Sequence, residues 1–297
     1  MNSVVKEILR LSASPPNIIY PIPLLPLLVY FQSSCDNVFA MIYIIVFSSI
    51  FYAGINLWNH VNDVPEDILA GRRNVLTENP KVRNVTTILS ILLYVVASIM
   101  AVLKMKDRIG LLFYAIVVFV TWIYSDRMLL GTFVRRWKDY YVTELLAFIV
   151  AIPSFTLTLW CMLDVLSIKA LVLAITMTFL MMSGIFPKDL KDATGDELAG
   201  LKTMAAVFRP STLIKLSFLM IWLYYATIAI ASLAGIFSPI NSIALLPALM
   251  LIKPTIVLRK RSWRIDLKSI IYMRYLVYSS LISLTLFVIS SYISRAL

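Results

Sequence analysis

Nine apolar runs, each close to the length that crosses a bilayer, constrain the fold of this chain more than any other feature. They cover residues 17–32, 37–58, 84–103, 109–125, 140–160, 165–187, 211–235, 240–258 and 269–293. About 20 helical residues cross a hydrocarbon core of roughly 30 Å. With 60% hydrophobic and 14% charged residues, the chain is expected to be an all-α, polytopic membrane protein. We predict nine transmembrane helices in one bundle, with residues 1–297 forming a single domain.

Basic residues are unevenly divided between the two sides of the predicted bundle. If the N terminus is cytoplasmic, nineteen of the 27 Lys and Arg residues lie on the cytoplasmic side and five on the other. This positive-inside bias predicts a cytoplasmic N terminus and an external C terminus. It also accounts for the formal charge of +11 without a nucleic-acid partner. The first apolar run contains three prolines and no Ala-x-Ala-like site follows it, so we expect no cleaved signal peptide.

Two short acidic regions each follow a long apolar run. The first, NLWNHVNDVPED (56–67), contains three Asn residues with Asp63, Glu66 and Asp67. The second, FPKDLKDATGDE (186–197), contains Asp189, Asp192, Asp196 and Glu197. Four predicted crossings separate the two regions, and an even number of crossings returns the chain to the side that it left. Both acidic regions are therefore expected at one cytoplasm-facing mouth of the bundle.

The spacing of these residues predicts that each acidic set lies on one face of a helix. Asp189, Asp192 and Asp196 are spaced i, i+3 and i+7, and Asn59, Asp63 and Asp67 are spaced i, i+4 and i+8. Pro65 is expected to break the first helix, with Asp63 capping a new helix and Glu66 completing a capping box. If so, Asp63 has a structural role as well.

Crowded carboxylates repel one another unless a cation lies between them. Magnesium prefers oxygen ligands and is typically bound by one or two carboxylates together with substrate phosphates. We therefore interpret the mouth as a site for a metal-bridged diphosphate. Five basic residues close by are expected to neutralise the remaining phosphate oxygens: Arg72, Arg73, Lys188, Lys191 and Lys202. The alternative is that both regions are simply solvated loops.

Three further residues narrow the possible chemistry. Cys35 and Cys161 lie far apart and have no metal-ligand spacing, so they are interpreted as small apolar residues. A disulfide between them is the alternative, since both fall near the outer ends of predicted helices. His60 is the one histidine of the chain, which excludes a site with several histidines. It is interpreted as a solvated loop residue, with a role in the mouth as the alternative.

The two acidic motifs resemble those of the UbiA-type intramembrane prenyltransferases. NLWNHVND with Asp67 resembles the first family motif, Asn-x-x-x-Asp-x-x-x-Asp, and KDLKDATGDELAGLKT resembles the second. The order of the motifs after predicted helices 2 and 6 is also similar. The resemblance implies that Asn59, Asp63 and Asp67 bind one Mg²⁺ with the prenyl diphosphate, and that Asp189, Asp192 and Asp196 bind a second ion.

The same resemblance implies roles for residues outside the two motifs. Arg72 or Arg73 matches a family position that contacts phosphate, Lys202 matches the family Lys-Thr pair, and Asn17 resembles an asparagine that lines the cavity. Where the family often has Tyr-x-x-x-Lys, this chain has Tyr124 and Met128, with Arg127 one place early. Arg127 is one replacement for the lysine, and Arg135, Arg136 and Lys138 are others. Tyr124 is assigned either to the reacting carbon or to an interfacial anchor.

The resemblance implies transfer of an isoprenoid chain from its diphosphate to an acceptor in the membrane. The local match NLxNxxxD resembles the menaquinone-type branch, which implies an aromatic, quinone-precursor acceptor. A non-aromatic lipid or a tetrapyrrole acceptor remains open. A secondary transporter for an anionic, lipid-like solute is the alternative from another class, although such proteins usually place ionisable groups near the middle of the membrane. A CDP-alcohol phosphotransferase would need an Asp-Gly-x-x-Ala-Arg element, which the chain lacks.

Overall fold

The computed structural model describes residues 3–13, 23–188, 190, 193–264 and 270–297, and within these ranges it contains helices and no β-strand. The long helices are α4 (Val38–Asn62), α7 (Pro80–Lys104), α8 (Ile109–Ser125), α9 (Tyr141–Leu163), α10 (Ile168–Lys188), α13 (Pro210–Leu233) and α15 (Ile271–Ala296). The 3₁₀ helix η4 (Pro239–Ala248) continues into α14 (Leu249–Lys260). Shorter helices are α1 (Ser3–Ser12), α3 (Leu24–Gln32), α5 (Val64–Leu69), α6 (Val75–Glu78), α11 (Ala193–Leu198) and α12 (Met204–Val207), with 3₁₀ turns η1 (Leu130–Thr132) and η2 (Trp137–Asp139).

Each of the nine predicted apolar runs contains a helix. Among the described residues, seven helical segments are long and apolar enough to cross a membrane, and α8 is a shorter apolar helix of 17 residues. The first run contains α3, which spans nine residues, so nine crossings stay a prediction. The all-helical fold of a membrane protein is confirmed.

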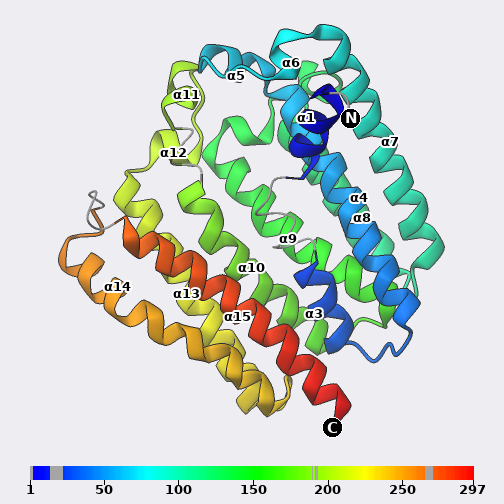
Figure 1. Ribbon diagram of the computed structural model, residues 1–297, viewed down its shortest axis with the longest axis vertical. Coiled ribbons are helices and arrows are strands. Elements are labelled where there is room, and N and C mark those ends of the chain that lie inside the picture. The colour runs from blue at the N-terminus through cyan, green and yellow to red at the C-terminus, as the bar shows by residue number, and fades with distance from the viewer. Residues whose placement is uncertain (1–2, 14–22, 189, 191–192, 265–269) are drawn as a thin grey trace.

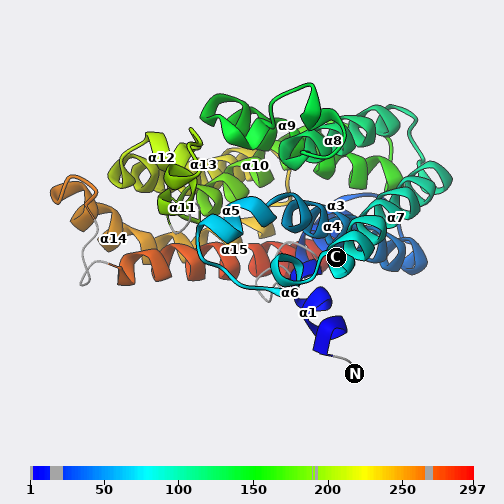
Figure 2. The ribbon, with the colours of Figure 1, turned by 90° about the horizontal axis from the view of Figure 1, so that it is seen from above.

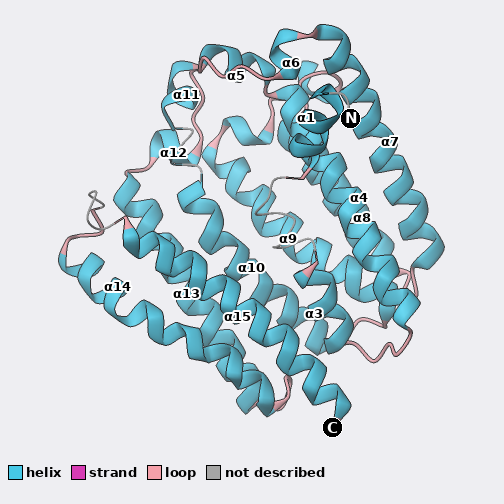
Figure 3. Ribbon diagram, in the orientation of Figure 1, coloured by secondary structure: helices cyan, strands magenta, loops and turns pink. Residues whose placement is uncertain are grey.

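The short helices gather at one end of the bundle. Figure 1 shows α1, α5, α6, α11 and α12 at this end, while the loops before α4 and after α13 lie at the other, together with the C terminus. Colouring by secondary structure makes the same division clear: long rods with a cap of short helices and loops (Figure 3). We call this end the mouth. Because both acidic motifs follow helices that end here, the fold brings them to the same end.

An aromatic cluster fills the part of the bundle between α4, α7, α8 and α9. Phe51 stacks on Phe155 with ring centroids 5.5 Å apart and meets Tyr94 edge-on at 5.6 Å. The α4 and α7 helices approach closely because residue 54 is glycine: a Cβ there would lie 3.3 Å from Leu93 Cβ. The two helices are firmly packed, which fixes the position of the first motif at the end of α4.

A seam of buried hydroxyls joins α13, η4 and α15. The hydroxyl of Tyr224 lies 3.0 Å from Ser283 Oγ, and that of Tyr225 lies 2.5 Å from Ser279 Oγ. The same serines donate to backbone carbonyls of η4, Ser283 to Ala244 at 2.6 Å and Ser279 to residue 247 at 3.0 Å. Polar contacts of this kind hold apolar helices together where lipid offers no hydrophobic driving force. Cys35 and Cys161 are both free thiols.

Candidate active site

The first acidic motif is built on a break between two helices. α4 ends at Asn62, and Asp63 joins it to α5, whose first turn contains Pro65. The backbone still bonds in helical fashion across the break, with Asp63 N donating to Asn59 O and Asp67 N to Asp63 O, both at 2.9 Å. Asn59, Asp63 and Asp67 therefore follow one another at successive turns, as the spacing predicted.

The predicted cap at this break is wrong. The Asp63 side chain makes no capping hydrogen bond to α5. It pairs instead with Lys138 and Arg136, and the carboxylate of Glu66 pairs with Arg127 and Arg136. Charged partners from another part of the chain hold these carboxylates more strongly than a backbone amide would. The break itself occurs where Pro65 predicted it.

The two acidic loops end in the same local structure. After α5, Gly71 adopts a left-handed φ of +68°, and Arg72 N donates to Asp67 O at 2.8 Å. After α11, Gly200 has a φ of +69°, and the amide of residue 201 donates to Asp196 O at 2.9 Å. Both are Schellman-type ends in which glycine avoids the strain of a left-handed residue. Asp67 and Asp196 thus occupy equivalent positions in two similar loops.

Each of these carboxylates is then held by the residue that caps the next short helix. Asn74, the N-cap of α6, donates from Nδ2 to Asp67 Oδ2 at 3.3 Å. Thr203, the N-cap of α12, donates from Oγ1 to Asp196 Oδ2 at 2.9 Å. The spacing is seven residues in both cases. One carboxylate oxygen is thus oriented in the same way in each loop.

The two loops lie next to each other. Helix α5 contacts α11 at the mouth, and the two helices are neighbours both from the side (Figure 1) and from above (Figure 2). Asp189 and Asp192, which belong to the second motif, lie outside the described residues, as do Asn17 and Lys191. Within the described part, the expectation that both acidic loops meet at one end of the bundle is confirmed.

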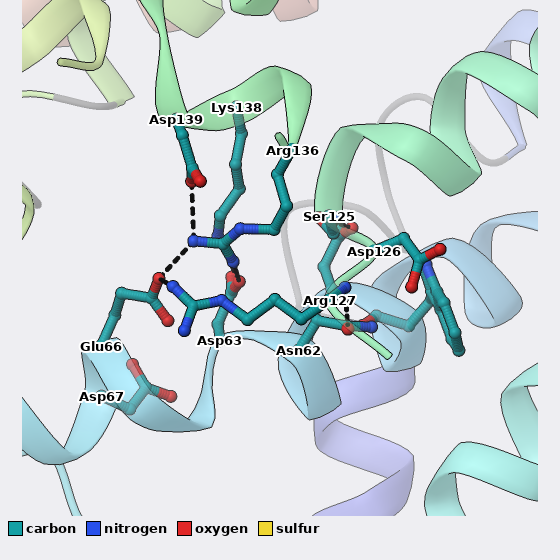
Figure 4. Close-up of polar contacts among 12 residues, drawn as sticks. Asn62, Asp63, Glu66, Asp67, Ser125, Asp126, Arg127, Arg136, Lys138 and Asp139 are labelled. Carbon is teal, nitrogen blue, oxygen red and sulfur yellow. Dashed lines mark hydrogen bonds and ion pairs between the residues drawn. The ribbon is translucent and has the colours of Figure 1, made fainter. Parts of the chain in front are cut away.

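A third segment, residues 126–140 between α8 and α9, completes the mouth. We call it the α8–α9 connection. Its Arg127 and Arg136 both pair with Glu66, and its Lys138 pairs with Asp63. Figure 4 shows the three basic side chains extending towards α5, with Arg136 between Glu66 and Asp139. Three basic groups and three carboxylates from distant parts of the sequence thus form one network.

A tight turn presents Arg127 to this network. The carboxylate of Asp126 accepts the backbone amides of residues 128, 129 and 130 and the indole N–H of Trp122 at 2.7–3.1 Å. Residue 131 must be glycine, because a Cβ there would lie 1.9 Å from Asp126 O. Arg127 N donates to Asn62 Oδ1 at 2.8 Å, which joins the turn to the end of α4.

The connection is also bonded to the second acidic loop. Lys202 N donates to Asp139 O at 3.0 Å, and Tyr141 N donates to Lys202 O at 2.7 Å. Nearby, the buried carboxylate of Glu144 accepts Met204 N at 2.7 Å. One segment therefore contacts both acidic loops, the first through side chains and the second through backbone.

Burial gives this network its electrostatic character. The side chain of Arg136 is 2% exposed and that of Glu66 is 10% exposed. Burial disfavours the charge of Arg136, but Asp139 and Glu66 outweigh it, so the pKa of Arg136 is raised. Burial, and then the neighbouring charge of Asp63, raise the pKa of Asp67. The carboxylate of Asp67 is therefore poorly solvated and lies close to a second negative charge, that of Asp63.

The remaining predicted residues lie around this network. Arg72 Nη1 is 3.5 Å from Asp67 Oδ1. The side chain of Arg72 is exposed, as are those of Arg73, Lys188 and Lys202. Ser125 Oγ donates to Asn59 Oδ1 at 2.6 Å.

Two residues with aromatic rings that were considered for this site, Tyr124 and His60, are both half-buried. Tyr124 is half-buried and packs against Phe148 with ring centroids 5.4 Å apart. His60 lies in the last turn of α4 and is half-buried, so its interpretation as a loop residue is wrong.

The oxygen donors of the first loop fit a hard cation. Asn59, Asp63 and Asp67 supply amide and carboxylate oxygens of the kind that Mg²⁺ prefers. Glu66 Oε2 is buried and has no hydrogen-bond partner among the described residues. Burial and the charge of Asp63 raise the pKa of Asp67, so a cation would stabilise its ionised carboxylate. No three Asp, Glu, His or Cys side chains converge as a metal cluster in the described ranges, which do not include two carboxylates of the second motif.

Comparison with known proteins places this site in a family. The model of the UbiA prenyltransferase family matches residues 21–279. The chain belongs to the UbiA prenyltransferase family. It is also 33% identical over 286 residues to an uncharacterized protein of Archaeoglobus fulgidus, covering 94% of this chain and 96% of that one.

Solved structures show the same UbiA fold. A UbiA homologue from Archaeoglobus fulgidus bound to GPP and Mg²⁺ has a TM-score of 0.66 at 16% identity, covering 98% of this chain and 100% of that one. A digeranylgeranylglyceryl phosphate synthase has a TM-score of 0.69 at 12% identity, covering 99% of both chains. As a UbiA family member with apolar helices that can span the membrane, the chain is an intramembrane prenyltransferase.

Sequence reasoning missed the partners of Glu66 in this UbiA site. Glu66 was assigned to a helix cap, and Asp139 was not singled out. The available signal was the charge density of residues 135–139, Arg-Arg-Trp-Lys-Asp, in a chain with 14% charged residues. Basic residues at that density beside a membrane helix indicate acidic partners nearby.

Proposed function

We propose that this UbiA enzyme transfers an isoprenoid group from a prenyl diphosphate to an acceptor in the membrane, with Mg²⁺ as cofactor. The observation that carries the proposal is the contact between α5 and α11. It sets Asp63 and Asp67 beside the loop of Asp196, at one end of an apolar bundle. A diphosphate bound there would have its hydrocarbon tail among the helices. The UbiA homologue whose structure holds GPP and Mg²⁺ supports this choice of donor and metal.

The proposed site uses the residues of both motifs. Asn59, Asp63 and Asp67 would hold one Mg²⁺, and Asp189, Asp192 and Asp196 a second. When bound, Mg²⁺ would neutralise the negative charge that develops on the diphosphate oxygens as it leaves. The substrate-binding residues that we propose around the metals are Asn17, Arg72, Arg73, Arg127, Lys188, Lys191 and Lys202. We propose that residues 1–297 form one prenyltransferase domain.

The chain's own groups account for the remaining requirements of the reaction. Cleavage of the allylic C–O bond leaves the electron pair on the diphosphate oxygen and positive charge on the allylic carbon. An electron pair of the acceptor then forms the new bond to this carbon, and the acceptor gives up a proton. Arg127 and Lys138 can exchange their carboxylate partners for phosphate oxygens, which keeps charge balanced at each step. The half-buried ring of Tyr124 would face the cationic carbon, and the helices around it exclude water.

We propose an aromatic, quinone-precursor acceptor, because the NLxNxxxD element of the first motif is similar to that of the menaquinone-type branch. The positive-inside bias supports a mouth on the cytoplasmic side, with the N terminus inside and the C terminus outside. A non-aromatic lipid phosphate is the second candidate. It is favoured by the similarity of the fold to a digeranylgeranylglyceryl phosphate synthase.

The test uses purified protein in liposomes with a radiolabelled prenyl diphosphate. We expect diphosphate release that requires both Mg²⁺ and an acceptor, and that falls by about 10²-fold or more in Asp63→Ala. Glu78→Gln, which removes an exposed carboxylate at the same end of the bundle, is the matched control. Full activity in Asp63→Ala would contradict the site. Products from an aromatic acid, a glycerol-ether phosphate and a porphyrin distinguish the acceptors, and uptake without bond cleavage would indicate a transporter.

A further inference from the structure

The α8–α9 connection has an outer face that the proposed reaction does not use. Phe133 is 90% exposed, and Leu129, Leu130 and Val134 are exposed beside it. These side chains lie between the end of one apolar helix and the start of the next, and so at the boundary of the membrane. A contiguous apolar patch on such a segment marks an interaction surface.

A pocket of about 410 Å³ opens beside this patch. It is lined by Val134, Arg135, Arg136, Trp137, Tyr140 and Thr143. The ring of Trp137 meets Phe119 edge-on at 6.4 Å, and Phe119 is a 52% exposed residue of α8. The pocket is therefore continuous with side chains that face the surrounding bilayer. Trp and Tyr are the residues that membrane proteins place at the headgroup level.

One arginine supplies a positive charge to the pocket that no carboxylate of the described residues neutralises. Arg127, Arg136 and Lys138 all pair with carboxylates of the mouth. Arg135 is exposed, lines the pocket, and forms no hydrogen bond or ion pair with any residue in the described ranges. An unpaired guanidinium next to apolar and aromatic side chains matches a ligand that has an anionic head and an apolar tail.

We infer that the α8–α9 connection binds the headgroup of an anionic phospholipid from the surrounding bilayer. Arg135 contacts the phosphate, Trp137 and Tyr140 surround the headgroup, and Phe133 with Leu129 enters the acyl region. The pocket is also lined by Arg136, which pairs with Glu66. A lipid in this pocket therefore borders directly on the mouth of the enzyme. The inference concerns binding and does not depend on the identity of the reaction.

Quenching of tryptophan fluorescence by brominated phospholipids tests this binding. The full-length protein is reconstituted in vesicles that contain a minor fraction of brominated phosphatidylglycerol or brominated phosphatidylcholine. The difference in fluorescence quenching between wild type and Trp137→Phe separates the signal of Trp137 from that of the other five tryptophans. We expect the anionic lipid to quench Trp137 more strongly than the zwitterionic lipid does. In Arg135→Gln, this preference for the anionic lipid should fall by about fivefold.

Lys81→Gln is the matched control, because it removes an exposed basic residue at the same end of the bundle. It is expected to keep the wild-type lipid preference. Equal quenching by both lipids in the wild type, or the same loss in Lys81→Gln, would overturn the inference. Phe133→Ser provides a second readout. If it abolishes association between copies of the chain and leaves lipid preference unchanged, the patch is a protein interface and the inference is wrong.

Discussion

Arg136 donates to the carboxylate of Glu66 although 70 residues separate them in the chain. Both side chains are almost inaccessible to water. The same guanidinium reaches Asp139 at 2.7 Å and Asp63 at 3.5 Å, so one buried cation contacts three carboxylates. Removal of one member of a buried ionic group leaves its partners charged and poorly solvated, which costs more than the net contribution of the pair.

Arg136→Gln is therefore expected to destabilise the protein by about 3–5 kcal/mol. For a chain of this size, the midpoint of thermal unfolding should fall by about 10 °C. The measurement is thermal unfolding of the purified protein in detergent without Mg²⁺. Arg264→Gln removes an exposed arginine and should stay within about 0.5 kcal/mol of wild type. Equal effects of the two substitutions would show that the network does not stabilise the fold.

Asp67 predicts how stability without metal depends on pH. Its pKa is raised above the ordinary value of 3.8 by burial and by Asp63. Between the unfolded and folded pKa values, the folded protein binds more protons than the unfolded chain, so stability falls as pH rises through this window. In the presence of a chelator, Asp67→Asn is expected to unfold at a higher temperature than wild type at pH 7. The difference should vanish below about pH 4, where Asp67 is protonated in both states.

Mg²⁺ is expected to reverse this order at pH 7, because the ion stabilises wild type and cannot bind equally well to an amide. Thermal unfolding from pH 3 to pH 8, with and without Mg²⁺, measures both effects. If wild type is more stable than Asp67→Asn in chelator at pH 7, the raised pKa of the Asp67 carboxylate is contradicted.

Thr203 is expected to position Asp196 as well as to cap α12. Thr203→Val removes both hydrogen bonds and should cost about 1 kcal/mol of stability. It should also raise the Mg²⁺ concentration for half-maximal activity by about 10–100-fold, as loss of a supporting hydrogen bond does at other metal sites. Thr203→Ser should restore both. A Thr203→Val enzyme that is less stable but has unchanged Mg²⁺ dependence would assign Thr203 to the cap alone.

Local sequence patterns predicted the helices and the composition of the mouth. Apolar runs of suitable length gave α4, α7 and α9, because crossing a membrane imposes a length and a composition on each helix. Pro65 gave the position of the break, because a proline within a helix removes one of its hydrogen bonds. The parity of the crossings then placed both acidic motifs at the same end.

The pairing of charges within the mouth was not predictable in this way. The partners of Asp63 and Glu66 lie more than 60 residues later, and no periodicity relates them. Asp63 was therefore assigned to a cap, which is the common role of an Asp before a short helix. The choice between Arg72 and Arg73 was open for the same reason. In the fold, both arginines are exposed, and the backbone turn at Gly71 brings Arg72 back to Asp67.

The central claim is that carboxylates of both loops act together on one diphosphate. A double-mutant cycle of Asp63→Asn and Asp196→Asn, measured as the affinity for an unreactive prenyl thiolodiphosphate in Mg²⁺, tests it most directly. We predict that the two effects are not additive, with a coupling free energy of about 1 kcal/mol or more, and that a chelator abolishes binding. Additive effects, or binding that is indifferent to the chelator, would contradict a ligand shared between the two loops.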